Sequence, residues 1–401
     1  MIEKNHWRLT AGPVPGREKT LKKRLWRRMV ALLLIGGLLI VCGCADTSPK
    51  QTEAKEIIAP QKSELLDTAE KVVAYVEEMA QAGAEEFTLV CSEEVYNALV
   101  RVTYQADRVE RKAYHSLLDQ AGLYDYRAVT AAVKRTITVS DVSFYPGYEI
   151  LRSVKAGTEA ELTSELRETL AEARAMAEAC KAADPLETAK NIQSAICEKT
   201  IYAYMTNQSH VDTAMGVLLE GVADCDGYAD AFYLVGGLAG LDIRYQHGIS
   251  SQYDLEENQI VTGSHMWNLL KLDGSWRVVD VCWADGENGI DYSWFNIGMD
   301  RASRSRTWQE DLTVPLLEHT DLSTRPETEY SVTNREELET AIREATEKGQ
   351  AAFTIIFDND SYGSRTEAFD MLWNYYSGEI SYYWDECSRV LTMILEDAAG
   401  G

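Results

Sequence analysis

A cysteine, a histidine and an aspartate, which together can carry out nucleophilic catalysis, occur within one stretch of this chain. Cys225 follows Asp224 and precedes an apolar, helix-like run, so we expect the thiol in the first turn of a helix with Asp224 as its N-cap. Exposed N–H groups and the helix dipole favour a thiolate there. His265 and Asp280 lie in two strand-like segments joined by an Asp-Gly pair. These residues predict a triad of nucleophile, general base and base-orienting carboxylate.

The Asp-Gly pair at residues 273–274 predicts how the histidine and the aspartate meet, because it is the preferred two-residue turn of a β-hairpin. With this turn, Trp267 faces Asp280 and His265 faces Cys282. His265 and Asp280 are then diagonal neighbours on one face of the sheet, about 7–8 Å apart and within side-chain reach. A three-residue turn would place Asp280 on the opposite face instead.

Each of the three residues also has an ordinary structural interpretation. Cys225 alone would be a small buried apolar residue, His265 a satisfied strand histidine and Asp280 a solvated acid. Their joint pattern favours a shared site. Two carboxylates, Asp224 and Asp226, flank the thiol and oppose its ionisation, so a protonated His265 has to outweigh them.

Four motifs in order around these residues resemble the transglutaminase-like superfamily with its papain-like core. They are TAMGVLLEG at 213–221, DCDGYADAF at 224–232, HMWNLLKLDGSWRVVDVCW at 265–283 and YSWFN at 292–296. The resemblance covers about residues 185–320. It implies that Cys225 is the nucleophile, His265 the general base and Asp280 its orienting partner. The sequence departs from the usual pattern at Asp226, Met266 and Cys282, where Gln, Ala and Thr are common.

The resemblance implies an α+β fold in which a helix-borne cysteine packs on an antiparallel sheet that carries the histidine and the aspartate. It also implies acyl transfer from an amide of a protein or peptide, with no cofactor and no metal. Water as acceptor gives a peptidase or amidase, which we favour by analogy with bacterial relatives, and a lysine amine gives cross-linking. The competing interpretation is a binding module whose site has decayed. Asp226, Trp267 and Tyr228 are the expected substrate-binding residues.

We expect residues 1–43 to be the export signal of a lipoprotein. A basic stretch at 22–28 precedes an apolar run at 29–43, which is shorter than the ~20 residues of a membrane span. Val41-Cys42-Gly43-Cys44 resembles the bacterial lipobox, which predicts lipidation of Cys44 and an extracytoplasmic, membrane-anchored lipoprotein. The alternatives are a plain secretory signal or a short anchor. Residues 44–62 are polar and predict a tether.

Composition narrows the remaining function classes. The 401 residues carry 39 basic and 64 acidic side chains, a net charge of −25, which disfavours nucleic-acid binding. The cysteines lack CxxC spacing, and His115, His210, His247 and His319 lack ligand-like spacing, so no zinc site or disulfide framework is predicted.

Two segments with a common layout flank the central domain, which we place at 185–322 after a connecting helix at 156–184. The flanking segments are residues 63–155 and 330–401, and each combines a helix, a strand containing Phe-Thr and a later β-rich strand. Two short matches relate them: LETA at 338–341 echoes LDTA at 66–69, and Gly349, Phe353 and Tyr362 are spaced as Gly83, Phe87 and Tyr96. We expect two small α+β modules, either copies of one unit or a chance agreement.

Local signals give three further helix predictions. Leu66, Val73, Val76 and Ala80 have the spacing of a helix face within 63–83, and helical sequence continues around 93–121. A capping box at Thr158–Glu161 predicts the start of the connecting helix. Asp184 and Pro185 then predict a new helix start.

Overall fold

The structure is a computed structural model that describes residues 65–106, 109–203, 209–254, 259–286, 289–307, 329–358, 363–385 and 389–396. The predicted export signal, Cys44 and tether lie outside these residues. Among the described residues, no helix is both long and apolar enough to cross a membrane.

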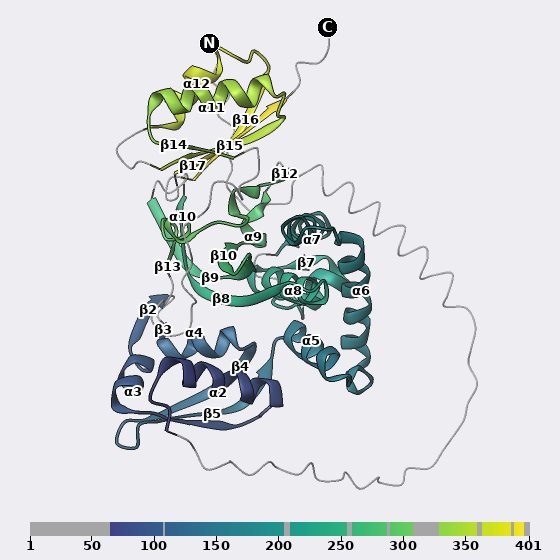
Figure 1. Ribbon diagram of the computed structural model, residues 1–401, viewed down its shortest axis with the longest axis vertical. Coiled ribbons are helices and arrows are strands. Elements are labelled where there is room, and N and C mark those ends of the chain that lie inside the picture. The colour runs from purple at the N-terminus through teal and green to yellow at the C-terminus, as the bar shows by residue number, and fades with distance from the viewer. Residues whose placement is uncertain are drawn as a thin grey trace, which may run out of the picture. The chain divides into compact units, whose positions relative to one another are not determined.

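The N-terminal sheet is antiparallel with strand order β1-β5-β4 (Figure 1). Its strands are β1 (Phe87–Val90), β4 (Leu123–Ala131) and β5 (Thr136–Phe144). The helices of this region are α2 (Ala69–Ala82), α3 (Glu93–Leu99) and α4 (Ala113–Gln120). A hairpin of β2 (Val102–Ala106) and β3 (Val109–Lys112) separates α3 from α4. The predicted helical sequence around 93–121 is therefore present as α3 and α4, and the β-branched and aromatic residues between these helices form the hairpin.

Helices connect this sheet to the central region. They are α5 (Pro146–Ala156), the 3-10 turn η1 (Glu159–Glu161), α6 (Ser164–Cys180) and α7 (Pro185–Lys199). Asp184 caps α7 at its predicted start by accepting a hydrogen bond from the Leu186 N–H. The predicted capping box at 158–161 instead forms η1, and α6 begins later because Thr163 caps it.

The central sheet has strand order β10-β9-β8-β13 and is antiparallel throughout. Its strands are β8 (Asp242–Asp254), β9 (Gln259–Leu272), β10 (Ser275–Val279) and β13 (Arg306–Thr307). Helix α8 (Cys225–Leu238) packs on this sheet, and the Asn268 side chain on β9 donates to the Ala229 carbonyl of α8 at 3.1 Å. Buried apolar residues of α6, α7, α8 and the sheet form one core cluster.

Short elements complete the central region. A π-helical turn η2 (Gly216–Glu220) precedes α8, and β6 (Ile201–Tyr202) pairs in parallel with β7 (Val222–Ala223). After β10 come α9 (Val281–Ala284), β11 (Asp285–Gly286), β12 (Gly289–Ile290), η3 (Tyr292–Trp294) and α10 (Met299–Ala302).

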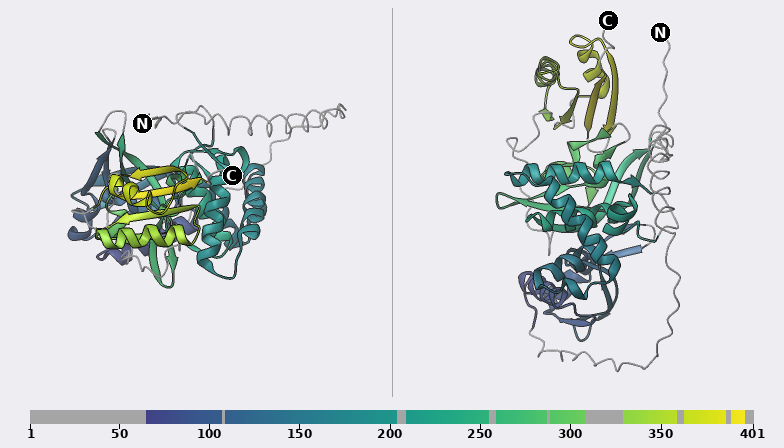
Figure 2. Two further views of the ribbon diagram at one scale, coloured as in Figure 1. Left: turned by 90° about the horizontal axis from the view of Figure 1, so that it is seen from above. Right: turned by 90° about the vertical axis from the view of Figure 1, so that its right-hand side faces the viewer.

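The C-terminal sheet has strand order β14-β15-β17-β16. Its elements are β14 (Glu329–Val332), α11 (Arg335–Glu347), β15 (Ala352–Phe357), α12 (Arg365–Leu372), β16 (Glu379–Asp385) and β17 (Val390–Glu396). Figure 2 shows α11 and α12 on the same side of this sheet. A separate core cluster forms between the sheet and these helices.

The N-terminal and C-terminal sheets agree in topology and register. The order β1-β5-β4 matches β15-β17-β16, and a left-handed glycine stands between the helix and the strand in both, Gly83 between α2 and β1 and Gly349 between α11 and β15. The Thr88 hydroxyl meets that of Thr138 across the strands at 3.0 Å, and Thr354 meets Thr392 at the same distance. Leu66 forms an isolated parallel bridge with Cys91 ahead of α2. Its counterpart in the C-terminal sheet is Val332, which forms the equivalent parallel pair with Phe357 between β14 and β15. Leu66 is therefore not part of the predicted helix, and the LDTA–LETA match is not the structural alignment.

Candidate active site

The cysteine occupies the predicted position in the first turn of α8. The Asp224 side chain caps this helix by accepting from the N–H groups of Asp226 and Gly227. Residues 211–213 cross directly over this turn, and a Cβ on Gly227 would lie 2.3 Å from the Val211 carbonyl oxygen. Only glycine allows this close approach, so the turn that carries Cys225 is fixed by its neighbours.

The hairpin has the predicted register up to its last pair. Asp273 and Gly274 both have positive φ angles, as a two-residue turn with φ > 0 at both positions requires. The pairing runs from Ser275 with Leu272 to Val279 with Asn268, and there β10 ends. The predicted strand pairs of Asp280 and Cys282 are therefore wrong. Asp280 leaves the sheet and becomes the N-cap of α9, where its Oδ1 accepts from the Trp283 N–H at 3.0 Å.

The contact between histidine and aspartate is nevertheless present. Asp280 Oδ2 lies 2.8 Å from His265 Nε2, and both side chains are buried. The same oxygen binds Arg306 through Nε at 3.2 Å and through Nη2, and Arg306 is fully buried as well. Burial raises the pKa of Asp280, but the His265 and Arg306 charges overcome it and hold that pKa well below its usual range.

Three tryptophans surround this polar group. The Arg306 guanidinium carbon lies 4.3 Å from the ring centroids of both Trp283 and Trp294 and 5.7 Å from that of Trp267. The His265 ring lies 5.6 Å from Trp283 and 5.9 Å from Trp267. The aromatic walls exclude water from the His265–Asp280 pair and stabilise the guanidinium through cation–π contact.

The thiol lies where β9 passes the start of α8. Cys225 packs against Met266, the residue after His265, whose backbone N–H lowers the thiol pKa, and the His265 charge lowers the pKa of the adjacent Asp226. The thiol also donates to Asp226 Oδ1 at 3.3 Å. Because Nε2 of His265 contacts Asp280, a proton exchange with Cys225 would have to use Nδ1.

The acidic neighbours shape the thiol's ionisation. Burial raises the pKa of Cys225, Asp226 and Asp224 raise it further, and the Met266 N–H offsets part of this. Burial beside Asp226 also raises the pKa of Asp224 to about 7. The resting thiol is therefore held in its protonated form, as the two flanking carboxylates predict.

The predicted substrate-binding residues divide into two groups. Asp226 lies beside the thiol with its side chain 28% exposed. Trp267 and Tyr228 are 1% and 0% exposed, respectively, and belong to core clusters. Tyr228 also donates its hydroxyl to Asp285. Both side chains are packed in the protein interior, and their contact with substrate stays a prediction.

Two side chains of this site were not predicted. Arg306 stands in a polar stretch with no motif around it, so only the fold brings it to Asp280. His247 contacts Asp226, although its position in the sequence has no ligand-like spacing. Strand alternation along β8 is the one signal that could have placed His247 beside the hairpin.

One group in the described part of the chain has metal-ligand spacing: Asp224, Cys225 and Asp226, whose ligand atoms lie within 4.8 Å of one another. The Asp224 carboxylate already accepts hydrogen bonds from two backbone N–H groups. The Asp226 carboxylate already contacts the thiol and His247. These contacts explain why the three side chains lie together, because Asp224 caps the helix that carries the thiol and Asp226 is the neighbour of the thiol.

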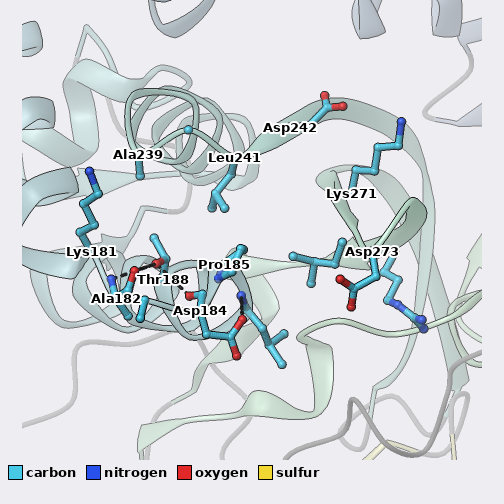
Figure 3. Close-up of a pocket in the computed structure, with 15 residues that line it drawn as sticks. Lys181, Ala182, Asp184, Pro185, Thr188, Ala239, Leu241, Asp242, Lys271 and Asp273 are labelled. Atoms are coloured by element: carbon cyan, nitrogen blue, oxygen red, sulfur yellow. Dashed lines mark hydrogen bonds between the residues drawn. The ribbon is translucent and has the colours of Figure 1, made fainter.

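A cavity of about 330 Å³ lies at the other end of α8 (Figure 3). The start of α7, the connection from α8 to β8 and the β9–β10 turn line it, with charges of both signs from Lys181, Asp184, Asp242, Lys271 and Asp273. None of the three predicted triad residues lines this cavity.

The central region of the chain is similar to a known family. Residues 174–281 match the family model described as the Transglutaminase-like superfamily. The match includes α7, α8 with Cys225, β9 with His265, and β10, and it ends one residue after Asp280.

Individual proteins are similar to this chain over a short stretch or at low sequence identity. A human protein named kyphoscoliosis peptidase is 35% identical over 65 residues, which is 16% of this chain and 10% of that protein. The solved periplasmic domain of TgpA from Pseudomonas aeruginosa, bound to ethylmercury, is 16% identical, with a TM-score of 0.25 over 37% of this chain and 55% of that one. LapG from Legionella pneumophila is 11% identical, with a TM-score of 0.23 over 43% of this chain and 89% of that one. This chain therefore spans about a tenth of the curated relative.

Proposed function

We propose that this protein is a cysteine-dependent acyl-transfer enzyme that cleaves amide bonds of proteins or peptides, acting as a peptidase or amidase. The observation that carries the proposal is the buried His265–Asp280 pair, 2.8 Å apart, together with the packing of Cys225 against Met266, the residue that follows His265. A carboxylate that holds an imidazole beside a thiol is the arrangement that activates a nucleophile.

The proposed reaction has two halves. In the first, His265 takes the thiol proton, the Cys225 sulfur bonds to the amide carbonyl carbon, and the C–N bond breaks as His265 gives that proton to the leaving amine. In the second, His265 removes a proton from water, the hydroxide attacks the thioester carbonyl, and the acid leaves as the thiol is restored. Asp280 stabilises the imidazolium in both halves.

The oxyanion formed in each half needs hydrogen-bond donors. The N–H groups of Asp226 and Gly227 are bound to Asp224. The Cys225 N–H is therefore the donor of this helix turn that we expect at the oxyanion.

We further propose that the enzyme is extracytoplasmic and held at the membrane through a lipid on Cys44, so that its substrates are surface proteins or peptides, including those linked to the cell wall. This part of the proposal rests on the basic stretch, the apolar run and the lipobox-like residues before Cys44.

A second candidate, a binding module with a decayed site, is favoured by one observation. Asp226 contacts the thiol and raises the pKa of Cys225 after burial has already raised it. A binding module requires the fold but does not require a reactive Cys225 thiol.

A substrate search separates the candidates. The purified protein and Cys225→Ala are incubated with a peptide library and with a biotinylated primary amine. A peptidase creates new peptide termini only with the unsubstituted protein, whereas a cross-linking enzyme incorporates the amine. Retention of intact peptides by both proteins, with neither product formed, would overturn the enzyme proposal in favour of binding.

A further inference from the structure

The contact between Asp226 and the nucleophile requires a compensating charge. Asp226 directly follows the nucleophile in the sequence, and its Oδ1 accepts from the Cys225 sulfur at 3.3 Å. An uncompensated carboxylate there would oppose the thiolate that the proposed reaction forms.

His247 on β8 lies against the other oxygen of the same carboxylate. Its Nε2 is 3.6 Å from Asp226 Oδ2, and its Nδ1 is 3.2 Å from Asp119 Oδ2. The His247 side chain is 11% exposed. Both contacts are ion-pair contacts, and two carboxylates facing one ring from opposite sides favour its imidazolium form.

The second carboxylate comes from outside the transglutaminase-like core. Asp119 lies on α4, beside the N-terminal sheet, where it pairs with Arg111 and accepts from the Tyr126 hydroxyl at 3.4 Å. Further contacts join the two regions around this point. Gln120 donates to Gln246 at 2.8 Å, and the Tyr145 hydroxyl, which follows β5, donates to Asp226 at 3.3 Å.

We propose that His247 is a positioning residue of the thiol site: its imidazolium compensates Asp226, and Asp119 from the N-terminal region holds that imidazolium in place. The N-terminal region thereby completes the charge environment of Cys225. This inference rests on the proposed function, because it concerns the reactivity of the same thiol.

The surroundings of His247 favour its charged form. The titratable groups that face it are Asp119 from α4, Asp226 from α8 and Tyr145, with Arg111, His115 and Tyr126 behind Asp119. Burial lowers the pKa of His247, but Asp119 and Asp226 overcome this and raise it to about 9. The cation therefore persists through neutral pH.

The test measures alkylation of Cys225 by iodoacetamide between pH 5 and 9, with the labelled residue identified by mass spectrometry. Loss of the compensating cation in His247→Gln raises the thiol pKa, so we expect alkylation at pH 7 to slow by about tenfold, which is one pKa unit in thiolate fraction. Asp226→Asn alone removes the opposing charge and should alkylate faster than the unsubstituted protein. Asp226→Asn in the His247→Gln background should restore the rate.

Matched variants separate charge compensation from folding. His210 also lies between two carboxylates, Glu165 and Glu220, without contacting the thiol, so His210→Gln should leave the alkylation profile unchanged. If Asp226→Asn fails to accelerate alkylation, or if the double variant stays as slow as a folded His247→Gln, the proposal is overturned. Dependence of the same rate on His265 tests the proposed function separately, because His265→Ala leaves the His247–Asp226 pair intact.

Discussion

At the scale of single residues, the candidate site depends on one shared carboxylate. Asp280 accepts from His265, from Arg306 and from the Trp283 backbone, and each of these donors comes from a different element. Arg306 therefore shares the negative charge of Asp280, which in a simple triad would interact with the histidine alone. The arrangement fixes Asp280 firmly, and it makes the stability of the site depend on a residue far along the chain.

Arg306→Met should be strongly destabilising. It leaves the Asp280 carboxylate buried without its guanidinium partner, and breaking a buried pair in this way costs about 3–5 kcal/mol. Urea unfolding measures the difference. Arg335→Gln is the control, because the Arg335–Glu367 pair has an arginine side chain that is 70% exposed and should contribute less than about 1 kcal/mol. Equal effects of the two variants would contradict the role of Arg306.

His247 makes stability depend on pH in a defined direction. Its pKa in the folded state is raised to about 9 from the ordinary value of 6.5. The group therefore stabilises the fold fully below pH 6.5, and its contribution is lost as the pH rises through 9. We expect the free energy of unfolding to fall over this range by about 3 kcal/mol more than in His247→Gln. Parallel pH profiles for the two proteins, measured by urea unfolding, would rule this contribution out.

At the scale of elements, the start of α8 carries two roles in one residue. Asp224 caps the helix and also raises the thiol pKa. Asp224→Ser keeps a capping oxygen and removes the charge, so stability should change by less than about 1 kcal/mol while Cys225 alkylation accelerates. Asp224→Ala loses the cap as well and should cost about 0.5–2 kcal/mol. Urea unfolding and alkylation rates report the two effects. Unchanged alkylation in both variants would show that Asp224 has no influence on the thiol.

Prediction from sequence succeeded where the signal is local. The cap at Asp224, the turn at Asp273 and Gly274 and the helix start at Pro185 each depend on the neighbouring residues alone, and each is present. The register of the hairpin followed from its turn. The end of β10 did not, because Asp280 changes from strand to helix cap under the influence of Trp294 and Arg306, whose positions no pattern specifies.

The rest of the site depends on contacts between distant segments. Arg306 and His247 reach the site only through sheet pairing and packing, so spacing along the chain could not reveal them. Trp267 and Tyr228 stand beside reactive residues in the sequence, yet strand alternation and helix periodicity direct them into the core.

At the scale of the whole molecule, the N-terminal and C-terminal sheets have the same strand order and a matching pair of threonine contacts. Both contact the region between them: Asp119 and Gln120 reach β8, and Thr392 donates to Asp291 at 3.3 Å. The N-terminal region contributes to the thiol's surroundings, whereas the described contacts of the C-terminal sheet lie away from Cys225.

The proposed anchor makes a prediction about the entire chain. If Cys44 is lipidated, the protein expressed in a bacterium with lipoprotein processing should partition into the detergent phase of a Triton X-114 extract. Cys44→Ala should move it to the aqueous phase or leave an uncleaved precursor. Equal partitioning of Cys42→Ala and the unsubstituted protein is the expected control result. Detergent partitioning of a Cys44→Ala protein that has been cleaved normally would contradict lipidation at this residue.

The central claim is that Cys225 and His265 form a reactive pair, and the pH dependence of Cys225 alkylation tests it most directly. The purified protein and its His265→Ala variant are treated with iodoacetamide across pH 5–9, and mass spectrometry locates the label. Labelling of Cys225 that is faster than at the other described cysteines and slowed in His265→Ala is the predicted result, because His265 takes the proton that the raised pKa of the Cys225 thiol would otherwise retain. Labelling that is no faster at Cys225 than at those cysteines, and indifferent to His265, would contradict it.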